Sequence, residues 1–168
     1  ELNRRCMDPN IAKIAVRMAL SLNRLDDGQM LLKSIYEYDE CAAGALEAEL
    51  LLKRGDKRKA LDVACDCYDE GPETGMALGM CLLETGNYRD ASSYLRKTRA
   101  SLIEAGCLFR MDELLMMESK AALGQDRILE ARKMLEAASE ITLNDSRRAM
   151  IAPSLAAMDA RIRRLYSS

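Results

Sequence analysis

The side chains best suited to chemistry in this sequence are six cysteines and several pairs of adjacent carboxylates. A thiolate can act as a nucleophile or a metal ligand, and paired carboxylates can divide acid and base roles between them. Two such pairs are Asp26–Asp27 and Asp69–Glu70, and the cysteines lie at positions 6, 41, 65, 67, 81 and 107. The chain contains no histidine, so a general base near neutral pH would need a perturbed carboxylate, lysine or cysteine.

The cysteine spacing favours neither a metal site nor a disulfide framework. Cys65 and Cys67 are two residues apart on a predicted helix and therefore point to different sides of it. No Cys-X-X-Cys pair is present. Since most cysteines fall within helical apolar patterns, we predict buried free thiols, no metal and no cofactor. Free thiols favour a reducing compartment, and we expect the cytoplasm.

The carboxylate pairs have a simpler interpretation as solvated capping residues. Both pairs fall where one predicted helix gives way to the next, and a carboxylate there can accept hydrogen bonds from the first amides of a helix. The glycine-containing turns match neither the GxGxxG nor the GxxxxGK[ST] phosphate-binding motif. We therefore predict that the protein is not an enzyme.

The elements that must position these residues are helices. The 168 residues include 25 Leu and 23 Ala, against only 14 Val, Ile and Thr together and no Trp, which favours helix over pleated sheet. The net charge of −2 provides no field that would attract nucleic acid or anionic lipid. The longest nearly apolar stretch, residues 149–158, is too short to span a membrane. We predict one all-α domain over residues 1–168 that binds neither nucleic acid nor membrane.

Three segments repeat one pattern: an apolar helix end, a turn of glycine and polar residues, and a second helix with an early Ala. They begin at Leu52, Leu83 and Leu123, and their turn glycines lie at positions 55, 86 and 124. Glycine can adopt the left-handed conformation that ends a helix, and a following Asp or Asn can cap the next one. A fourth, weaker copy begins at Leu25 and places Gly28 in its turn.

This pattern resembles the tetratricopeptide repeat, a helix–turn–helix unit of 34 residues. In the copy from Cys41 to Thr74, Ala48 and Ala60 occupy the small positions and Pro72 the closing proline. The small first-helix position recurs as Ala19, Ala48, Gly79 and Ser119, and its second-helix partner as Leu31, Ala60, Ala91 and Ala131. The spacings from Ala19 onward are 29, 31 and 40 residues rather than a constant 34, and most signature aromatic residues are missing.

The resemblance implies a right-handed α-solenoid of about four antiparallel helix hairpins plus a C-terminal capping helix, which covers the last apolar face. An unrelated helical bundle is the alternative. The predicted helices cover residues 9–25, 29–39, 41–54, 57–70, 73–85, 88–105, 108–124, 127–142 and 145–165.

The resemblance also implies a concave groove, lined by the first helix of each hairpin, that binds a peptide or helix of a partner protein. Carried over by repeat position, the partner-binding residues are Asn23, Arg24, Glu49, Leu52, Lys53, Met76, Met80, Leu83, Glu84, Met116 and Lys120. Further lining positions are Lys13, Val16, Leu20, Ala42, Ala45, Glu73 and Glu113. The family's clamp for a C-terminal carboxylate is partly matched by Asn23, Arg24 and Lys53. An acidic ligand would, however, be opposed by Glu49 and Glu84.

Methionine supplies a second indication of binding, because flexible thioethers suit adaptable apolar surfaces. Met76, Met80 and Met116 fall on the predicted inner wall, where they either bind a partner or fill a core without Trp. Met18 and Met134 are predicted to be ordinary core residues.

Three functions fit this pattern. The first is a protein–protein interaction scaffold or adaptor that captures a partner segment in the groove. The second is a regulatory or sensor module of a larger signalling or transcriptional protein. The third is a structural solenoid that forms homo-oligomers by stacking its end helices.

Overall fold

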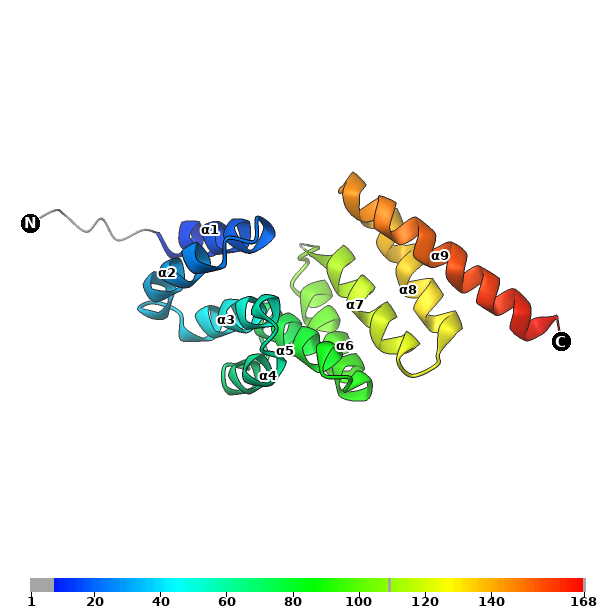
Figure 1. The fold of residues 1–168 in the computed structure, drawn as a ribbon, viewed down its shortest axis with the longest axis horizontal. Helices are drawn as coiled ribbons and strands as arrows, with labels where there is room; N and C mark the ends of the chain where they lie inside the picture. The colour runs from blue at the N-terminus through cyan, green and yellow to red at the C-terminus, as the bar shows by residue number, and fades with distance from the viewer. Residues whose placement is uncertain (1–7, 109, 168) are drawn as a thin grey trace, which may run out of the picture. The chain divides into compact units, whose positions relative to one another are not determined.

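The computed structural model describes residues 8–108 and 110–167, which fold into helices with no strand (Figure 1). The all-α prediction is confirmed, and each predicted helix range corresponds to one observed helix, although the first range, 9–25, also includes the first residue of the second helix. Within the described residues the helices are α1 (Pro9–Ser21), α2 (Leu25–Tyr36), α3 (Glu40–Arg54), α4 (Lys57–Asp66), α5 (Pro72–Glu84), α6 (Tyr88–Glu104), α7 (Met111–Leu123), α8 (Ile128–Ile141) and α9 (Asp145–Tyr166).

The turn between α1 and α2 lies earlier in the chain than predicted. Asn23, with a φ of 57°, takes the left-handed conformation in this turn, and α2 begins at Leu25. Gly28 lies inside α2, where an added Cβ would stand 3.3 Å from Leu50 Cδ1 and 3.7 Å from Ala19 Cβ. Gly28 therefore serves close helix packing rather than a turn, and it replaces the predicted Leu31 as the residue opposite Ala19.

The chain forms two compact units, which divide between Thr85 and Gly86. The N-terminal unit contains α1 to α5, and the C-terminal unit contains α6 to α9. The repeat pattern, which predicts one domain over residues 1–168, contains no signal for this division.

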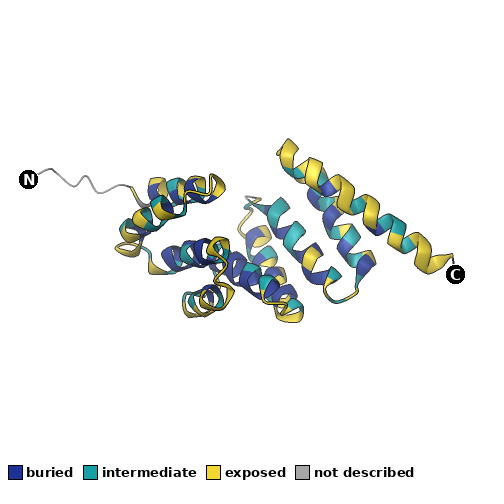
Figure 2. Cartoon of the chain, in the orientation of Figure 1, coloured by how far each residue is buried: buried dark blue, intermediate teal, exposed yellow. Residues whose placement is uncertain are grey.

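Within the N-terminal unit, the first helices of the predicted hairpins form a row. In this first-helix row α1 packs against α3, and α3 packs against α5. The second helices pack against this row: α2 contacts α1 and α3, and α4 contacts α3 and α5. Figure 2 shows much of α3 and α5 as buried. Burial of apolar side chains holds the unit together, and one contiguous core contains Val16, Leu20, Leu32, Ile35, Leu46 and Leu50.

The turn between α3 and α4 has the predicted chemistry. Gly55 ends α3 with a φ of 86°, in the left-handed region that glycine tolerates best. The next residue, Asp56, caps α4 by accepting a hydrogen bond of 3.2 Å from the Lys59 amide. The small residues on the two sides of the turn, Ala48 in α3 and Ala60 in α4, are fully buried, so α3 and α4 approach closely there.

Within the C-terminal unit α6 packs against α7, α7 against α8, and α8 against α9. The predicted small pair of the last hairpin is in direct contact, since the Ser119 hydroxyl donates to the Ala131 carbonyl over 2.8 Å. Gly124 does not take the left-handed conformation that the repeat pattern predicts. A Cβ added to Gly124 would lie 2.2 Å from Tyr88 Cγ, so the glycine instead makes room for the Tyr88 ring.

Candidate partner-binding site

Ion pairs cross the first-helix row at the end where α3 and α5 begin. Lys13 of α1 lies 2.7 Å from Asp39, the N-cap of α3, and 3.9 Å from Glu73 of α5. Arg17, one turn further along α1, reaches Glu73 over 2.8 Å. Because these contacts run from α1 to α5, the predicted lining residues Lys13 and Glu73 share one surface of the row.

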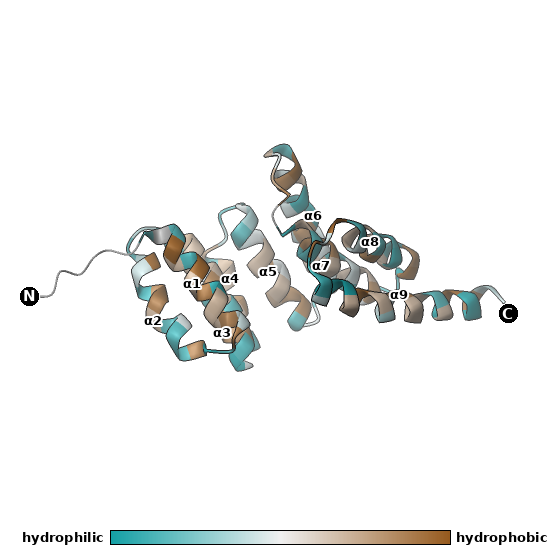
Figure 3. Cartoon of the chain, turned by 90° about the horizontal axis from the view of Figure 1, so that it is seen from above, coloured by the Kyte–Doolittle hydropathy of each residue, from teal (hydrophilic) through white to brown (hydrophobic). Residues whose placement is uncertain are grey.

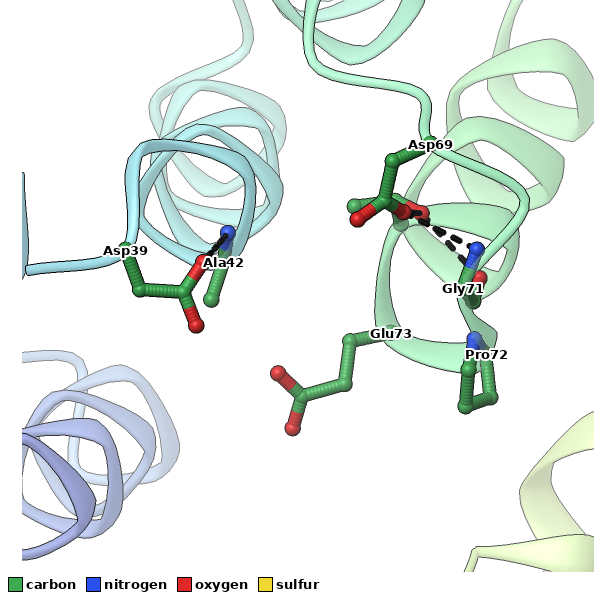
Figure 4. A pocket seen from close by; sticks show the side chains of 7 residues that line it. Asp39, Ala42, Asp69, Gly71, Pro72 and Glu73 are labelled. Atoms are coloured by element: carbon green, nitrogen blue, oxygen red, sulfur yellow. Dashed lines mark hydrogen bonds between the residues drawn. The ribbon is translucent and has the colours of Figure 1, made fainter. Parts of the chain in front are cut away.

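A polar pocket lies beside these ion pairs. Its wall contains three carboxylates, those of Asp39, Asp69 and Glu73, together with Ala42, Gly71, Pro72 and Thr74. In Figure 4 the Asp69 side chain turns back toward Gly71, whereas the Glu73 side chain extends away from that loop; Glu73 pairs with Lys13 and Arg17 of α1. The pocket wall is therefore acidic, and two of its carboxylates, Asp39 and Glu73, are paired with cations of α1.

Two carboxylates of this pocket accept hydrogen bonds near the starts of α3 and α5. Asp39 accepts hydrogen bonds from Lys13 over 2.7 Å and from the Ala42 amide over 3.0 Å, and these bonds hold its pKa below the usual range. Asp69 accepts from the Thr74 hydroxyl over 2.6 Å and from the Gly71 amide over 2.9 Å, which also lowers its pKa. Both groups stay ionised near neutral pH. Asp39 caps α3, but the N-cap of α5 is Gly71 and has no side-chain cap, so the capping role predicted for Asp69 is wrong. Asp69 instead fixes the loop before α5 through Gly71 and Thr74.

Part of the predicted inner face of the row is buried rather than accessible. Ala42 and Ala45 are buried, and so are two residues predicted to bind a partner, Met76 at 2% exposure and Leu83 at 4%. These two side chains are core residues, which corrects their assignment to the binding surface. Their helical positions match the inner face, but neighbouring helices cover that part of α5.

Toward the C-terminal ends of α3 and α5 the predicted residues return to the surface. Leu52 and Met80 are half-buried, Lys53 is exposed, and Glu49 is half-buried. Glu84 lies 3.2 Å from Lys57 at the start of α4. This end of the row therefore carries two partly accessible apolar side chains with charged residues of both signs around them.

The predicted residues Asn23 and Arg24 lie in the turn that follows α1. Both are exposed, and Asn23 is the left-handed residue of that turn. The Arg24 guanidinium lies 2.5 Å from Asp27. Arg24 is thus already paired with a carboxylate, which argues against the clamp for a C-terminal carboxylate.

The remaining predicted residues lie in the C-terminal unit. Met116 is half-buried and Lys120 exposed, both on α7. Glu113, a further predicted lining position, is held by ion pairs with Arg110 and Arg147. The predicted groove residues are therefore distributed over two units, with Met116 and Lys120 separated from the other nine by the division at Gly86.

Arg17 is the site residue that the sequence analysis missed. Val16 was the predicted lining residue of that turn, yet it is fully buried in the core. The sequence contains one signal for Arg17, its spacing: Arg17 follows Lys13 by four residues and therefore lies on the same helix face.

The cysteines and methionines depart from the predictions in two places. Cys81 is buried, and burial raises its pKa to about 12; Cys67 is half-buried, and burial raises its pKa to about 11. Cys65 is exposed, contrary to the prediction, and Cys6 lies outside the described residues. Met18, predicted to be a core residue, is 58% exposed.

Metal-binding clusters and membrane-spanning helices are both absent from the residues that the structure describes. No group of His, Cys, Asp and Glu in this part of the chain is arranged to hold a metal ion, and no helix in it is long and apolar enough to cross a membrane. A scan against models of protein families finds no match, and a search of curated proteins finds no relative.

Proposed function

We propose that the protein is an interaction scaffold of the tetratricopeptide-like helical-hairpin type, which binds a segment of a partner protein on the first-helix row. The observation that carries this proposal is the set of ion pairs from Lys13 and Arg17 to Glu73. These pairs support a common surface over α1, α3 and α5, as expected for the inner face of stacked hairpins. In this proposal the protein works in the cytoplasm, and its architecture is a solenoid of about four hairpins with a capping helix.

The partner segment would bind at the C-terminal end of the row. Leu52 and Met80 offer partly exposed apolar contacts, and Lys53, Glu49 and Glu84 offer charged edges of both signs. An apolar centre with a charged rim suits an amphipathic helix or an extended segment with apolar anchors. The mixed charge argues for a segment that itself carries both signs.

Peptide selection tests this proposal even while the natural partner is unidentified. Peptides enriched from a random display library would be titrated against the wild type and against the double variant Leu52→Ser/Met80→Ser. Loss of two apolar anchors should weaken binding by about thirtyfold, which corresponds to about 2 kcal/mol. The matched control is Leu143→Ser/Met150→Ser, which alters one exposed leucine and one exposed methionine of the C-terminal unit.

The control pair should bind as the wild type does, with unchanged circular dichroism for both doubles. If the control pair abolishes binding while the Leu52/Met80 pair has no effect, the partner site lies in the C-terminal unit. Failure to enrich any peptide that competes for the row would also contradict the proposal.

A second candidate function, self-association, is favoured by one observation on α1. Four large apolar side chains at helical spacing are 58–65% exposed along this helix; they are Ile11, Ile14, Met18 and Leu22. Figure 3 shows the hydrophobic colouring of α1. Such a stripe on a soluble surface marks an interaction face. Sedimentation of the wild type and of Ile14→Glu/Met18→Glu over a range of concentrations would detect association through α1, and a monomer at all concentrations would exclude it.

A further inference from the structure

An arginine-lined pocket lies in the C-terminal unit, away from the residues predicted to bind a partner. Its wall is formed by Arg89, Ser92, Ser93, Arg96, Gln125 and Arg127. The four residues from α6 follow one another at helical spacing and so share one face of its N-terminal half. Arg127, the N-cap residue of α8, and Gln125 approach that face from the turn between α7 and α8.

The turn that carries Arg127 is held firmly against the start of α6. The side-chain amide of Gln125 donates to the backbone carbonyls of Tyr88 over 2.9 Å and of Ala121 over 3.0 Å. The Tyr88 ring also occupies the space that a side chain at position 124 would fill. The pocket is therefore built on fixed backbone, and its arginines do not depend on a freely moving loop for their placement.

Internal contacts leave donor capacity in this pocket. Arg127 pairs with Glu130 over 2.6 Å and donates to the Ser92 hydroxyl oxygen over 3.1 Å, but its Nε is buried without a hydrogen-bond partner. Arg96 uses the same two acceptors, Ser92 at 3.2 Å and Glu130 at 3.4 Å. Within the described part of the chain Arg89 forms no ion pair.

The charge balance of the pocket is positive. Three guanidinium groups line its wall, and no carboxylate does. The nearest acidic partner is Glu130, which Arg96 and Arg127 share, and Glu118 acts on both Arg96 and Arg99. Arg89 and Arg96 are exposed, so their guanidinium groups are accessible to an anion from solution.

We propose that this pocket binds a phosphate monoester group, in which Arg89, Arg96 and Arg127 donate to the phosphate oxygens and the hydroxyls of Ser92 and Ser93 complete the contacts. Guanidinium groups match phosphate oxygens in geometry and form charge-assisted hydrogen bonds with them. A monoester near neutral pH carries about two negative charges, which suits a wall that contains three arginines and no carboxylate. The shared chemistry is the phosphate group, either free in solution or borne by a phosphorylated side chain of a peptide.

Calorimetric titration of the whole chain at constant ionic strength, with sodium chloride as the reference salt, tests the proposal. The probes are inorganic phosphate and a short peptide that contains one phosphoserine, with the unphosphorylated peptide as its blank. The wild type should give saturable binding of at least one phosphorylated probe. Removal of one charge-assisted hydrogen bond, in Arg89→Gln or Arg96→Gln, should weaken it by about tenfold or more.

Arg89→Gln is the decisive variant, because Arg89 is exposed and its replacement breaks no internal ion pair. Arg127→Gln would also disturb the contacts with Ser92 and Glu130, so circular dichroism must accompany it. The matched control is Arg164→Gln, which removes an exposed arginine on α9 and should leave binding unchanged.

Tighter binding of the phosphopeptide than of inorganic phosphate would identify a phosphorylated segment as the source, and equal binding would identify the free anion. The proposal is overturned if neither probe binds beyond the chloride reference. It is equally overturned if Arg89→Gln and Arg96→Gln bind as the wild type does, or if Arg164→Gln weakens binding to the same extent.

Discussion

The two units of the chain use charge in opposite ways. In the N-terminal unit the interior of the first-helix row is apolar or small, and residues 42–46 of α3 are all buried. Its ion pairs, such as Lys13–Asp39, lie at the edge of the row. In the C-terminal unit α7 carries a charged residue into the interior, because Glu118 is only 5% exposed. The difference predicts that packing volume governs the first unit and charge pairing the second.

The Glu118 carboxylate shows what this second strategy involves. Arg99 stands 3.0 Å from it, yet burial still raises the pKa of Glu118. Asp112 shows the opposite balance. Burial works against its ionised form, but hydrogen bonds from Thr142 and Arg147, each of 2.7 Å, outweigh that effect and lower its pKa. The pKa of each carboxyl group therefore depends on the balance between its burial and the hydrogen bonds it accepts: burial dominates at Glu118, and the several hydrogen bonds dominate at the less buried Asp112.

The largest effect on stability is expected at Asp112. Asp112→Ala leaves the Thr142 hydroxyl and part of the Arg147 guanidinium without acceptors in a partly buried site. We expect the free energy of unfolding in urea to fall by about 3 kcal/mol. Asp145→Ala, which removes a 95% exposed carboxylate paired with Arg148, is the control and should change it by less than about 1 kcal/mol. Equal effects at the two positions would contradict the importance of charge pairing in the C-terminal unit.

A somewhat smaller effect is expected from overpacking the N-terminal unit. Ala60 is fully buried where α4 meets α3, so Ala60→Leu should lower the free energy of unfolding by about 2 kcal/mol. Ala152→Leu, on the exposed face of α9, provides the matched change of size without a neighbour to displace. An unchanged melting temperature for Ala60→Leu would mean that the repeat register in this hairpin is wrong.

The smallest effect, a change in pH dependence, is expected at Glu118. Its pKa is raised in the folded protein above the ordinary value of 4.5, so the folded state holds this proton more tightly than the unfolded state. Stability contributed by the protonated form is complete below pH 4.5 and is lost as the pH rises through the folded pKa. Urea unfolding of wild type and Glu118→Gln between acid and neutral pH should therefore show the wild type losing stability relative to the variant. A difference that grows in favour of the wild type as the pH rises would reverse the sign and refute this account of Glu118.

The sequence predicted the helices well because their signals are local. Gly55 and Asp56 specify one turn completely, and the small residues Ala48, Ala60 and Ala131 are buried as the repeat pattern predicted. The sequence pattern places the first turn too late in the chain, because a glycine can serve either a turn or close helix packing. Gly28 serves close packing inside α2, and Asn23 supplies the left-handed residue instead.

The candidate site was predicted less well because exposure depends on neighbours that are distant in the sequence. Val16 and Arg17 differ by one residue, yet one lies in the core and the other reaches Glu73 across the row. Met76 and Met80 share a helix face, but only Met80 remains partly accessible. The burial of Glu118 has no local sequence signal, since it depends on how α6 and α8 pack against α7.

The central claim is that partner segments bind at the C-terminal end of the first-helix row, and amide hydrogen exchange tests it most directly. Exchange would be followed for the chain alone and saturated with a peptide from the selection. We predict that binding slows exchange in residues 49–54 of α3 and 80–84 of α5, and leaves residues 143–150 unchanged. Slowed exchange confined to the C-terminal unit, with the ends of α3 and α5 unaffected, would contradict the claim.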